Sequence, residues 1–376
     1  MRTIGLYVHM PFCLRKCAYC SFVSFAGREF LIGRYIDAVL AEANIYAPLL
    51  QNRVVDTVFI GGGTPSSLEP EQFSSLVNGL KSVCRWQPHE FTIEANPETL
   101  SDDKLAAYAG AGASRLSIGL QTHDDAILKS IGRQHSWEVF KKAYETAARR
   151  FENINVDIIF GLPGQSIKTH IETLQRVAAL SPQHVSAYAL KIEPGTPLAQ
   201  DYAGVGEEED RAMCHMTEEI LTAAGYIHYE TSNFAQKGFA CRHNLKYWTG
   251  GEYLGLGVAS HSYINFEKPS RTGNTEDLEA YIAAVMAGQR PVVSETVLDA
   301  AELLAEYLML RLRLSDGIRF DDYRKKFGTE FTRTYAKAIA KTQKAGLITA
   351  DQSGIKPTSK GFDLQNALIV EFIKNL

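Results

Sequence analysis

Six apolar segments of strand length recur along the first half of the chain, and a segment with helical periodicity follows each of them. The apolar runs are nearly continuous rather than alternating, which indicates strands buried on both faces. Six such units in succession predict an α/β fold with a parallel sheet and helices outside it. The predicted strands are Gly5–Met10, Thr57–Ile60, Phe91–Ala95, Arg115–Gly119, Asn155–Phe160 and His184–Leu190. The predicted helices are Gly33–Tyr46, Glu71–Val83, Asp102–Ala109, Trp137–Arg150, Ile167–Leu180 and Glu208–Ala224.

The alternation ends after Tyr263, and residues 265–274 are rich in turn formers, which predicts a linker or an exposed loop. Helical stretches and one short hairpin follow, and this order resembles a winged helix. We therefore expect two domains, residues 1–265 and residues 266–376. The predicted elements of the second domain are helices over Leu278–Met286, Leu298–Leu312, Thr329–Ala345 and Ser359–Lys374, and a hairpin made by Leu347–Ala350 and Gly354–Pro357.

The composition argues against several classes of partner. The formal net charge is −4, so the protein is not drawn broadly toward nucleic acid or an anionic membrane. Residues 296–376 carry 13 Lys and Arg against 10 Asp and Glu, a small excess for phosphate binding, so we expect no nucleic-acid partner. No segment approaches the roughly 18 uncharged apolar residues of a membrane span, and the first residues lack a signal-peptide pattern. We expect a cytoplasmic protein, with a peripheral membrane contact left open.

Three of the six cysteines, Cys13, Cys17 and Cys20, have the spacing C-x3-C-x2-C directly after the first predicted strand. Folds of this kind place their chemistry in loops at the carboxyl ends of parallel strands. Three thiolates can bind three irons of a 4Fe–4S cubane and leave the fourth iron open to a small chelator. The alternatives are inert thiols or a structural zinc site, but structural zinc usually takes four ligands in two pairs. No second pair of cysteines is present, so the spacing favours the cluster.

The stretch from Tyr7 to Phe12, followed by this cysteine spacing, resembles the radical-SAM superfamily. More narrowly, it is similar to oxygen-independent coproporphyrinogen III oxidases and their haem-chaperone relatives. The resemblance runs from Tyr7 to the final predicted helix. It implies a partial (β/α)6 barrel of TIM type, followed by a smaller helical, winged-helix-like domain. It also implies a 4Fe–4S cluster on the three cysteines, S-adenosylmethionine as cofactor and a reductant for the cluster.

A glycine-rich turn, Gly61 to Pro65, follows the second predicted strand. Glycines let a backbone approach a ligand closely, and exposed N–H groups there are able to bind a carboxylate. A tight turn alone explains a glycine triplet equally well. In the radical-SAM family the corresponding motif contacts the amino group of the methionine moiety. The resemblance therefore assigns Gly62, Gly63 and Thr64 to the S-adenosylmethionine site.

Further polar residues lie at or just beyond the predicted strand ends. Glu94 and Asp157 are charged residues inside apolar strands, which is costly unless they are paired, so a salt bridge between strands is one explanation. The resemblance instead implies that they bind S-adenosylmethionine. A guanidinium at Arg133 suits the methionine carboxylate, and Asp157 and Gln121 suit the ribose hydroxyls. The resemblance also assigns Tyr7 and Tyr19 to this site. Tyr19 lies between two cluster ligands and is placed to stack near the adenine.

A second motif, H-N-x-x-Y-W, begins at His243. It occurs in the haem-chaperone branch, and the resemblance makes His243 a candidate haem ligand. A histidine beside Tyr247 and Trp248 offers an axial nitrogen and flat apolar surface. The alternative is a hydrogen-bonded histidine in the barrel mouth with the aromatic rings as packing. Cys241 is a rival axial ligand.

Two departures from the oxidase pattern favour the chaperone branch. The oxidases carry a further cysteine two residues after the third cluster ligand, where this chain has Phe22, and an N-terminal extension where this chain begins its first strand. Ser21 replaces the aspartate frequent in the chaperone branch. We expect a haem chaperone that binds haem, or another tetrapyrrole, and passes it to an apo-haemoprotein. The alternatives are coproporphyrinogen III oxidation, radical haem degradation or another radical-SAM reaction, and the sequence leaves monomer or dimer open.

Overall fold

The computed structural model describes residues 2–265 and 267–374. Six parallel strands form its centre, and strands that follow one another in the chain are neighbours in the sheet. This order confirms the predicted parallel α/β sheet. The strands are β1 (Arg2–Met10), β2 (Arg53–Gly62), β3 (Arg85–Ala95), β4 (Arg115–Gln121), β5 (Ile154–Phe160) and β6 (His184–Ala189).

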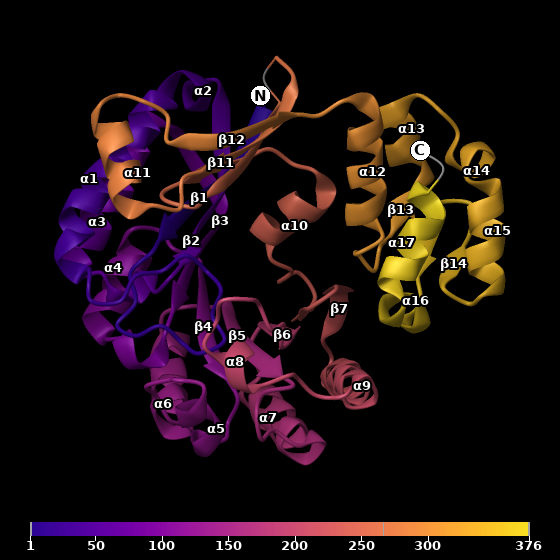
Figure 1. Cartoon of the computed structure of the whole chain (residues 1–376), viewed down its shortest axis with the longest axis horizontal. Helices are drawn as coiled ribbons and strands as arrows, with labels where there is room; N and C mark the ends of the chain where they lie inside the picture. The colour runs from indigo at the N-terminus through magenta and orange to yellow at the C-terminus, as the bar shows by residue number, and fades with distance from the viewer. Residues whose placement is uncertain (1, 266, 375–376) are drawn as a thin grey trace.

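Helices cover the outer face of this sheet (Figure 1). In α3, for example, Phe73, Leu76, Val77 and Leu80 recur at helical spacing and are all buried in the main core. The long outer helices are α1 (Ile32–Ile45), α3 (Pro70–Val83), α4 (Asp102–Gly110), α6 (Trp137–Ala148), α7 (Ile167–Leu180) and α9 (Glu207–Ala223). Shorter helices are α2 (Ala47–Gln51), α5 (Asp125–Ser130) and α8 (Leu198–Asp201).

The sheet extends beyond the six parallel strands on both sides, in the order β12-β11-β10-β9-β1-β2-β3-β4-β5-β6-β8-β7. Because β12 and β7 end this order without pairing to each other, the sheet forms a partial barrel. The added strands are β7 (Ile227–Glu230), β8 (Asn233–Ala235), β9 (Tyr253–Leu256), β10 (His261–Asn265), β11 (Pro269–Asn274) and β12 (Val292–Val297).

The predicted linker at residues 265–274 is wrong, because β10 and β11 form an antiparallel hairpin there. Its polar residues suggested a loop, yet several are buried and hydrogen-bonded. Asn274 donates to Glu42 of α1 at 2.7 Å. Glu42 also accepts from the Gly257 N–H at 2.8 Å and from the hydroxyl of Tyr281, in α11 (Leu278–Met286), at 2.7 Å. Burial raises the pKa of Glu42 to about 7.

The second unit has a hydrophobic core of its own, which runs from Tyr307 to Phe372. The predicted hairpin is confirmed, whereas the predicted last helix is interrupted at Leu364. We therefore propose the domain boundary near Leu298, not at residue 265. The elements of this unit are α12 (Ala300–Arg311), β13 (Ile318–Arg319), α13 (Phe320–Phe327), α14 (Phe331–Thr334), α15 (Ala336–Lys344), β14 (Ile348–Ala350), β15 (Gly354–Pro357), α16 (Ser359–Asp363) and α17 (Gln365–Ile373).

Across the described parts of the chain, every helix is too short or too polar to cross a bilayer.

We expect Glu42→Ala to lower the free energy of unfolding by about 2–4 kcal/mol, because it leaves the buried Gly257 N–H and Tyr281 hydroxyl without an acceptor and removes one of the three acceptors of the Asn274 amide. Glu279→Ala, on α11, is the control. The Glu279 side chain is 55% exposed and pairs with Arg28 and Arg34, so its loss should cost under about 0.5 kcal/mol. Chemical denaturation of both variants checks this, and equal effects would show that the contact between α1 and β11 adds nothing to the barrel.

Candidate functional site

The carboxyl ends of the parallel strands surround a cavity of about 410 Å³. Parallel strands all end at the same edge of a sheet, so residues far apart in sequence meet there. Of the predicted site residues, Tyr7 and His243 do not line this cavity. Those that do are Cys13, Cys17, Tyr19, Cys20, Gly62, Gly63, Thr64, Glu94, Gln121, Arg133 and Asp157.

The cysteine loop leaves β1 at Pro11 and returns alongside it at Phe25. The Phe25 N–H donates to the Pro11 carbonyl at 2.7 Å, and the Cys13 N–H donates to the Phe25 carbonyl at 3.2 Å. All three thiols face the same cavity, and burial raises the pKa of Cys13 and of Cys20. Within the described residues, no three His, Cys, Asp or Glu side chains lie together at metal-ligand spacing. The thiols thus border one space without forming a closed cage.

The glycine turn after β2 is fixed by close approach of β1. Gly62 has φ of +106°, and a Cβ there would lie 2.3 Å from Nδ1 of His9. Its N–H donates to Oε2 of Glu94 at 2.9 Å. The N–H groups of Gly63 and Thr64 donate to the carbonyls of Met10 and Phe12, each at 2.8 Å. The expected binding of a carboxylate by these N–H groups is therefore wrong, because all three already donate within the protein.

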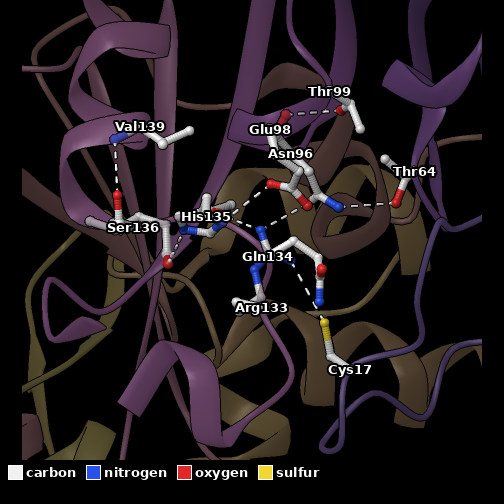
Figure 2. A network of polar contacts seen from close by, with 12 residues as sticks. Cys17, Thr64, Asn96, Glu98, Thr99, Arg133, Gln134, His135, Ser136 and Val139 are labelled. Carbon is white, nitrogen blue, oxygen red and sulfur yellow. Dashed lines mark hydrogen bonds and ion pairs between the residues drawn. The ribbon is translucent and has the colours of Figure 1, made fainter. Parts of the chain in front are cut away.

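A chain of hydrogen bonds links Cys13 and Cys17 across the cavity wall, and Figure 2 shows its part from Thr64 to Cys17. The Thr64 hydroxyl donates to Sγ of Cys13 at 3.4 Å, and the Asn96 amide donates to Thr64 at 3.1 Å. Arg133 donates from Nη2 to Oδ1 of Asn96 at 2.9 Å and from Nη1 to Sγ of Cys17 at 3.8 Å. Asn96 was missed by the sequence reasoning, although it stands two residues after Glu94, where β3 ends.

Hydrogen bonds hold the Arg133 side chain in place but do not use all of its donors. It also donates from Nη2 to the Gly119 carbonyl at 2.6 Å. Its Nε is buried without a hydrogen-bond partner in the described structure. Buried donors are rarely left unpaired. Burial lowers the pKa of this guanidinium, but nearby Tyr19 and Cys17 more than offset that and raise it, so Arg133 is a fixed positive charge with a donor to spare.

Glu94 and Asp157 are half-buried and line the same cavity, and neither forms an ion pair among the residues that the structure describes. The salt-bridge explanation is therefore wrong. Asp157 accepts from the Ser117 hydroxyl at 2.9 Å and from the Asn155 amide at 2.8 Å. Burial, reinforced by Asp157, raises the pKa of Glu94 to about 7, and burial also raises that of Asp157. Gln121 adopts φ of +75°, a conformation rare outside glycine, at the end of β4.

Tyr7 lies beneath the cavity rather than in its wall. Its hydroxyl is 2.9 Å from Nδ1 of His9, and Nε2 of His9 is 2.8 Å from the Val23 carbonyl. Val23 belongs to the returning half of the cysteine loop. His9 therefore connects β1 to that loop, a role that the motif around Tyr7 did not reveal.

His243, the candidate haem ligand, is fully buried in this structure. It lies in α10 (Arg242–Thr249), and its ring nitrogens are 2.9 Å from the Thr57 hydroxyl and 2.8 Å from the Tyr247 hydroxyl. Burial lowers its pKa to about 3. Glu90, which accepts from the His243 N–H at 2.9 Å, precedes Glu94 by four residues, about 13 Å along the strand. The ring therefore sits deep in the barrel.

Cys241, the rival haem ligand, is equally remote from the cavity. Its thiol is buried and donates to Glu90 at 3.3 Å, and burial raises its pKa to about 12. His243 is thus buried and hydrogen-bonded, as the alternative to haem ligation predicts, although it lies at the opposite end from the mouth, whereas Trp248 is half-buried beside Leu303 and Tyr307 of α12.

Comparison with known proteins decides the family. The chain matches the radical SAM superfamily over residues 7–177 and the HemN C-terminal domain over residues 298–364. It is 31% identical over 374 residues to the heme chaperone HemW of Lactococcus lactis, covering 98% of this chain and 96% of that protein. It is also 31% identical to that of Bacillus subtilis, covering 98% and 99%. The chain belongs to the HemW family of radical-SAM proteins.

The HemW family shares its architecture with a solved oxidase. Coproporphyrinogen III oxidase (HemN) from Escherichia coli, a radical SAM enzyme, superposes on this chain with a TM-score of 0.87 at 25% sequence identity. The match covers 100% of this chain and 91% of the oxidase chain. This likeness confirms the predicted barrel with a smaller C-terminal unit. Membership of the radical-SAM superfamily implies a 4Fe–4S cluster and S-adenosylmethionine. Three thiols on one cavity and the spare donor of Arg133 fit these two groups.

Replacing Cys13, Cys17 and Cys20 together by Ala should abolish the visible absorbance of the reconstituted protein, which should otherwise hold about four irons per chain, as a 4Fe–4S cubane does. Cys84→Ala and Cys214→Ala are the controls, since neither thiol borders the cavity. Iron analysis and absorbance spectra check this. Full absorbance in the triple variant would contradict the assignment.

Asn96→Ala should weaken S-adenosylmethionine binding about tenfold, because Arg133 loses the side-chain acceptor that orients it. Arg133→Ala should have the larger effect, roughly 2–5 kcal/mol, if the guanidinium pairs with a buried carboxylate. Asn244→Ala, in α10, is the matched control. Calorimetric titration measures all three, and unchanged affinity in Arg133→Ala would remove this residue from the site.

Proposed function

We propose that this protein is a haem chaperone, which binds haem and delivers it to apo-haemoproteins. The observation that carries the proposal is similarity along nearly the entire chain to several bacterial proteins named heme chaperone HemW. Phe22, at the position where the oxidases carry a further cysteine, supports the same choice. The acceptor would be a cytoplasmic apo-haemoprotein, which agrees with six cysteines that are all free in this structure.

Cys13, Cys17 and Cys20 would hold the 4Fe–4S cluster, and an external reductant would supply its electron. When bound, such a cluster supplies the electron that cleaves a carbon–sulfur bond of S-adenosylmethionine. Hydrogen bonds from Thr64 and Arg133 to two of the sulfurs would stabilise thiolates there. These donors suit cluster ligands better than neutral thiols.

S-adenosylmethionine would lie in the deep part of the cavity. The spare Nε–H of Arg133 suits its carboxylate, and the carbonyls of Gly62 and Gly63 suit its amino group. Asp157 and Gln121 would accept from ribose hydroxyls, with Glu94 close by and Tyr19 stacking near the adenine. Ligand hydrogen bonds to Glu94 and Asp157 would offset the cost of desolvating the two carboxyl groups, which raises the pKa of both.

His243 is not part of this proposal. A haem iron would have to displace the bonds of its ring to Thr57 and Tyr247 and open the barrel around α10.

The second candidate function is oxidative decarboxylation of coproporphyrinogen III. The superposition on the Escherichia coli oxidase along the whole chain favours it. Phe22 speaks against it, because that position in the oxidases carries the further cysteine.

The reconstituted protein should retain haem through gel filtration and transfer it to an apo-haemoprotein, read from the Soret band of the acceptor. Under anaerobic, reducing conditions with S-adenosylmethionine it should form no protoporphyrinogen IX from coproporphyrinogen III. Chromatography of the tetrapyrroles checks the second point. Formation of that product over many turnovers, without haem retention, would replace the chaperone by the oxidase.

A further inference from the structure

The rim of the cavity carries a large exposed aromatic side chain. Phe22 lies two residues after the last cysteine of the loop, lines the cavity and is 66% exposed. Tyr188, near the end of β6, also lines the cavity and is exposed, and the apolar side chains of Ile159 and Leu190 line the same cavity. Exposed apolar surface at the mouth of a cavity is typical of a ligand site.

Two cationic side chains accompany this apolar surface. Arg15 and Lys16 lie in the cysteine loop, line the same cavity and are exposed. Neither forms an ion pair within residues 2–265 and 267–374, whereas the third cation of the rim, Lys191, is paired with Glu193 at 2.6 Å. The cysteine loop therefore brings two positive charges without an ion pair in the described residues, and one exposed ring, to the lining of one cavity.

The rim differs in chemistry from the deep part of the cavity. Deeper in, buried Arg133 and half-buried Glu94 and Asp157 offer hydrogen bonds to a compact polar ligand. The rim instead combines aromatic faces with exposed cations. Such a combination matches a flat, apolar macrocycle that carries two carboxylates at one edge.

We propose that haem binds at this rim, with its face against Phe22 and its two propionates paired with Arg15 and Lys16. The proposal rests on the chaperone function above and names the site that serves it. The rim lies outside the S-adenosylmethionine groups, so both ligands would occupy one cavity, the cofactor deeper and the haem at the mouth.

The aromatic part of the proposal is tested with Phe22→Ala and Phe30→Ala. Phe30, in the neighbouring turn Glu29–Leu31, is 78% exposed and does not line the cavity, so it is a matched control. Phe22→Ala should weaken haem binding about tenfold in a Soret titration, Phe22→Trp should restore it, and Phe30→Ala should leave it unchanged. Iron content and S-adenosylmethionine affinity should stay at wild-type values in all three.

The electrostatic part is tested with Lys16→Glu and haem dimethyl ester. Lys16→Glu should weaken haem binding about tenfold but leave binding of the ester unchanged, because the ester has no carboxylates. Lys168→Glu is the control, since the Lys168 side chain is 87% exposed on α7, away from the cavity.

The outcomes separate this proposal from the function on which it rests. If the wild-type protein binds no haem, the chaperone function fails and the rim site fails with it. If the wild type binds haem but Phe22→Ala equals Phe30→Ala and Lys16→Glu equals Lys168→Glu, haem binds elsewhere and the function stands. If Phe22→Ala loses the cluster as well, the ester experiment with Lys16→Glu decides, and equal loss of haem and ester overturns the rim site.

Discussion

The parallel pairing of β1 through β6 is the constraint on which the site depends. Every strand ends at the same edge, so the loops that follow β1, β2, β3 and β4 meet although their residues lie up to 120 positions apart in the chain. The hydrogen bonds from Thr64 through Asn96 to Arg133 then fix these loops relative to one another and end on the sulfurs of Cys13 and Cys17. The position of a cluster held there would depend on residues that follow β2, β3 and β4 as well as on the cysteine loop itself.

The interior of the barrel is divided between two kinds of polar group. At the closed end, His243 of α10 hydrogen-bonds to three other side chains, those of Thr57, Glu90 and Tyr247. At the open end, the Nε of Arg133 lacks a hydrogen-bond partner in the described part of the chain, and desolvation raises the pKa of Glu94 and of Asp157 although Arg115 opposes this shift. At the open end these groups face the cavity, where a bound ligand would complete them.

Periodicity was sufficient for the six β/α units, because continuous apolar runs and amphipathic helices are local properties. The cysteine spacing and the glycine turn were also readable, since each is a contiguous motif. Residues 265–274 were predicted to be a loop because Asn274 is polar, but its amide hydrogen-bonds to the buried carboxyl of Glu42, 232 positions earlier in the chain. His243 was misplaced for the same kind of reason, as its partner Thr57 lies on a distant strand. Partners of this kind come only from the tertiary structure.

The buried carboxyl of Glu42 has a consequence for the folding equilibrium. Its ordinary value of 4.5 applies to the unfolded chain, whereas burial raises its pKa to about 7 in the folded state. Between these values folding takes up a proton, so the hydrogen ion acts as a ligand of the folded state alone. The stability that this group contributes is complete below pH 4.5 and is lost as the pH rises through 7. The contacts that Glu42 makes between α1, β11 and α11 therefore stabilise the fold most at acid pH and less as the pH approaches neutrality.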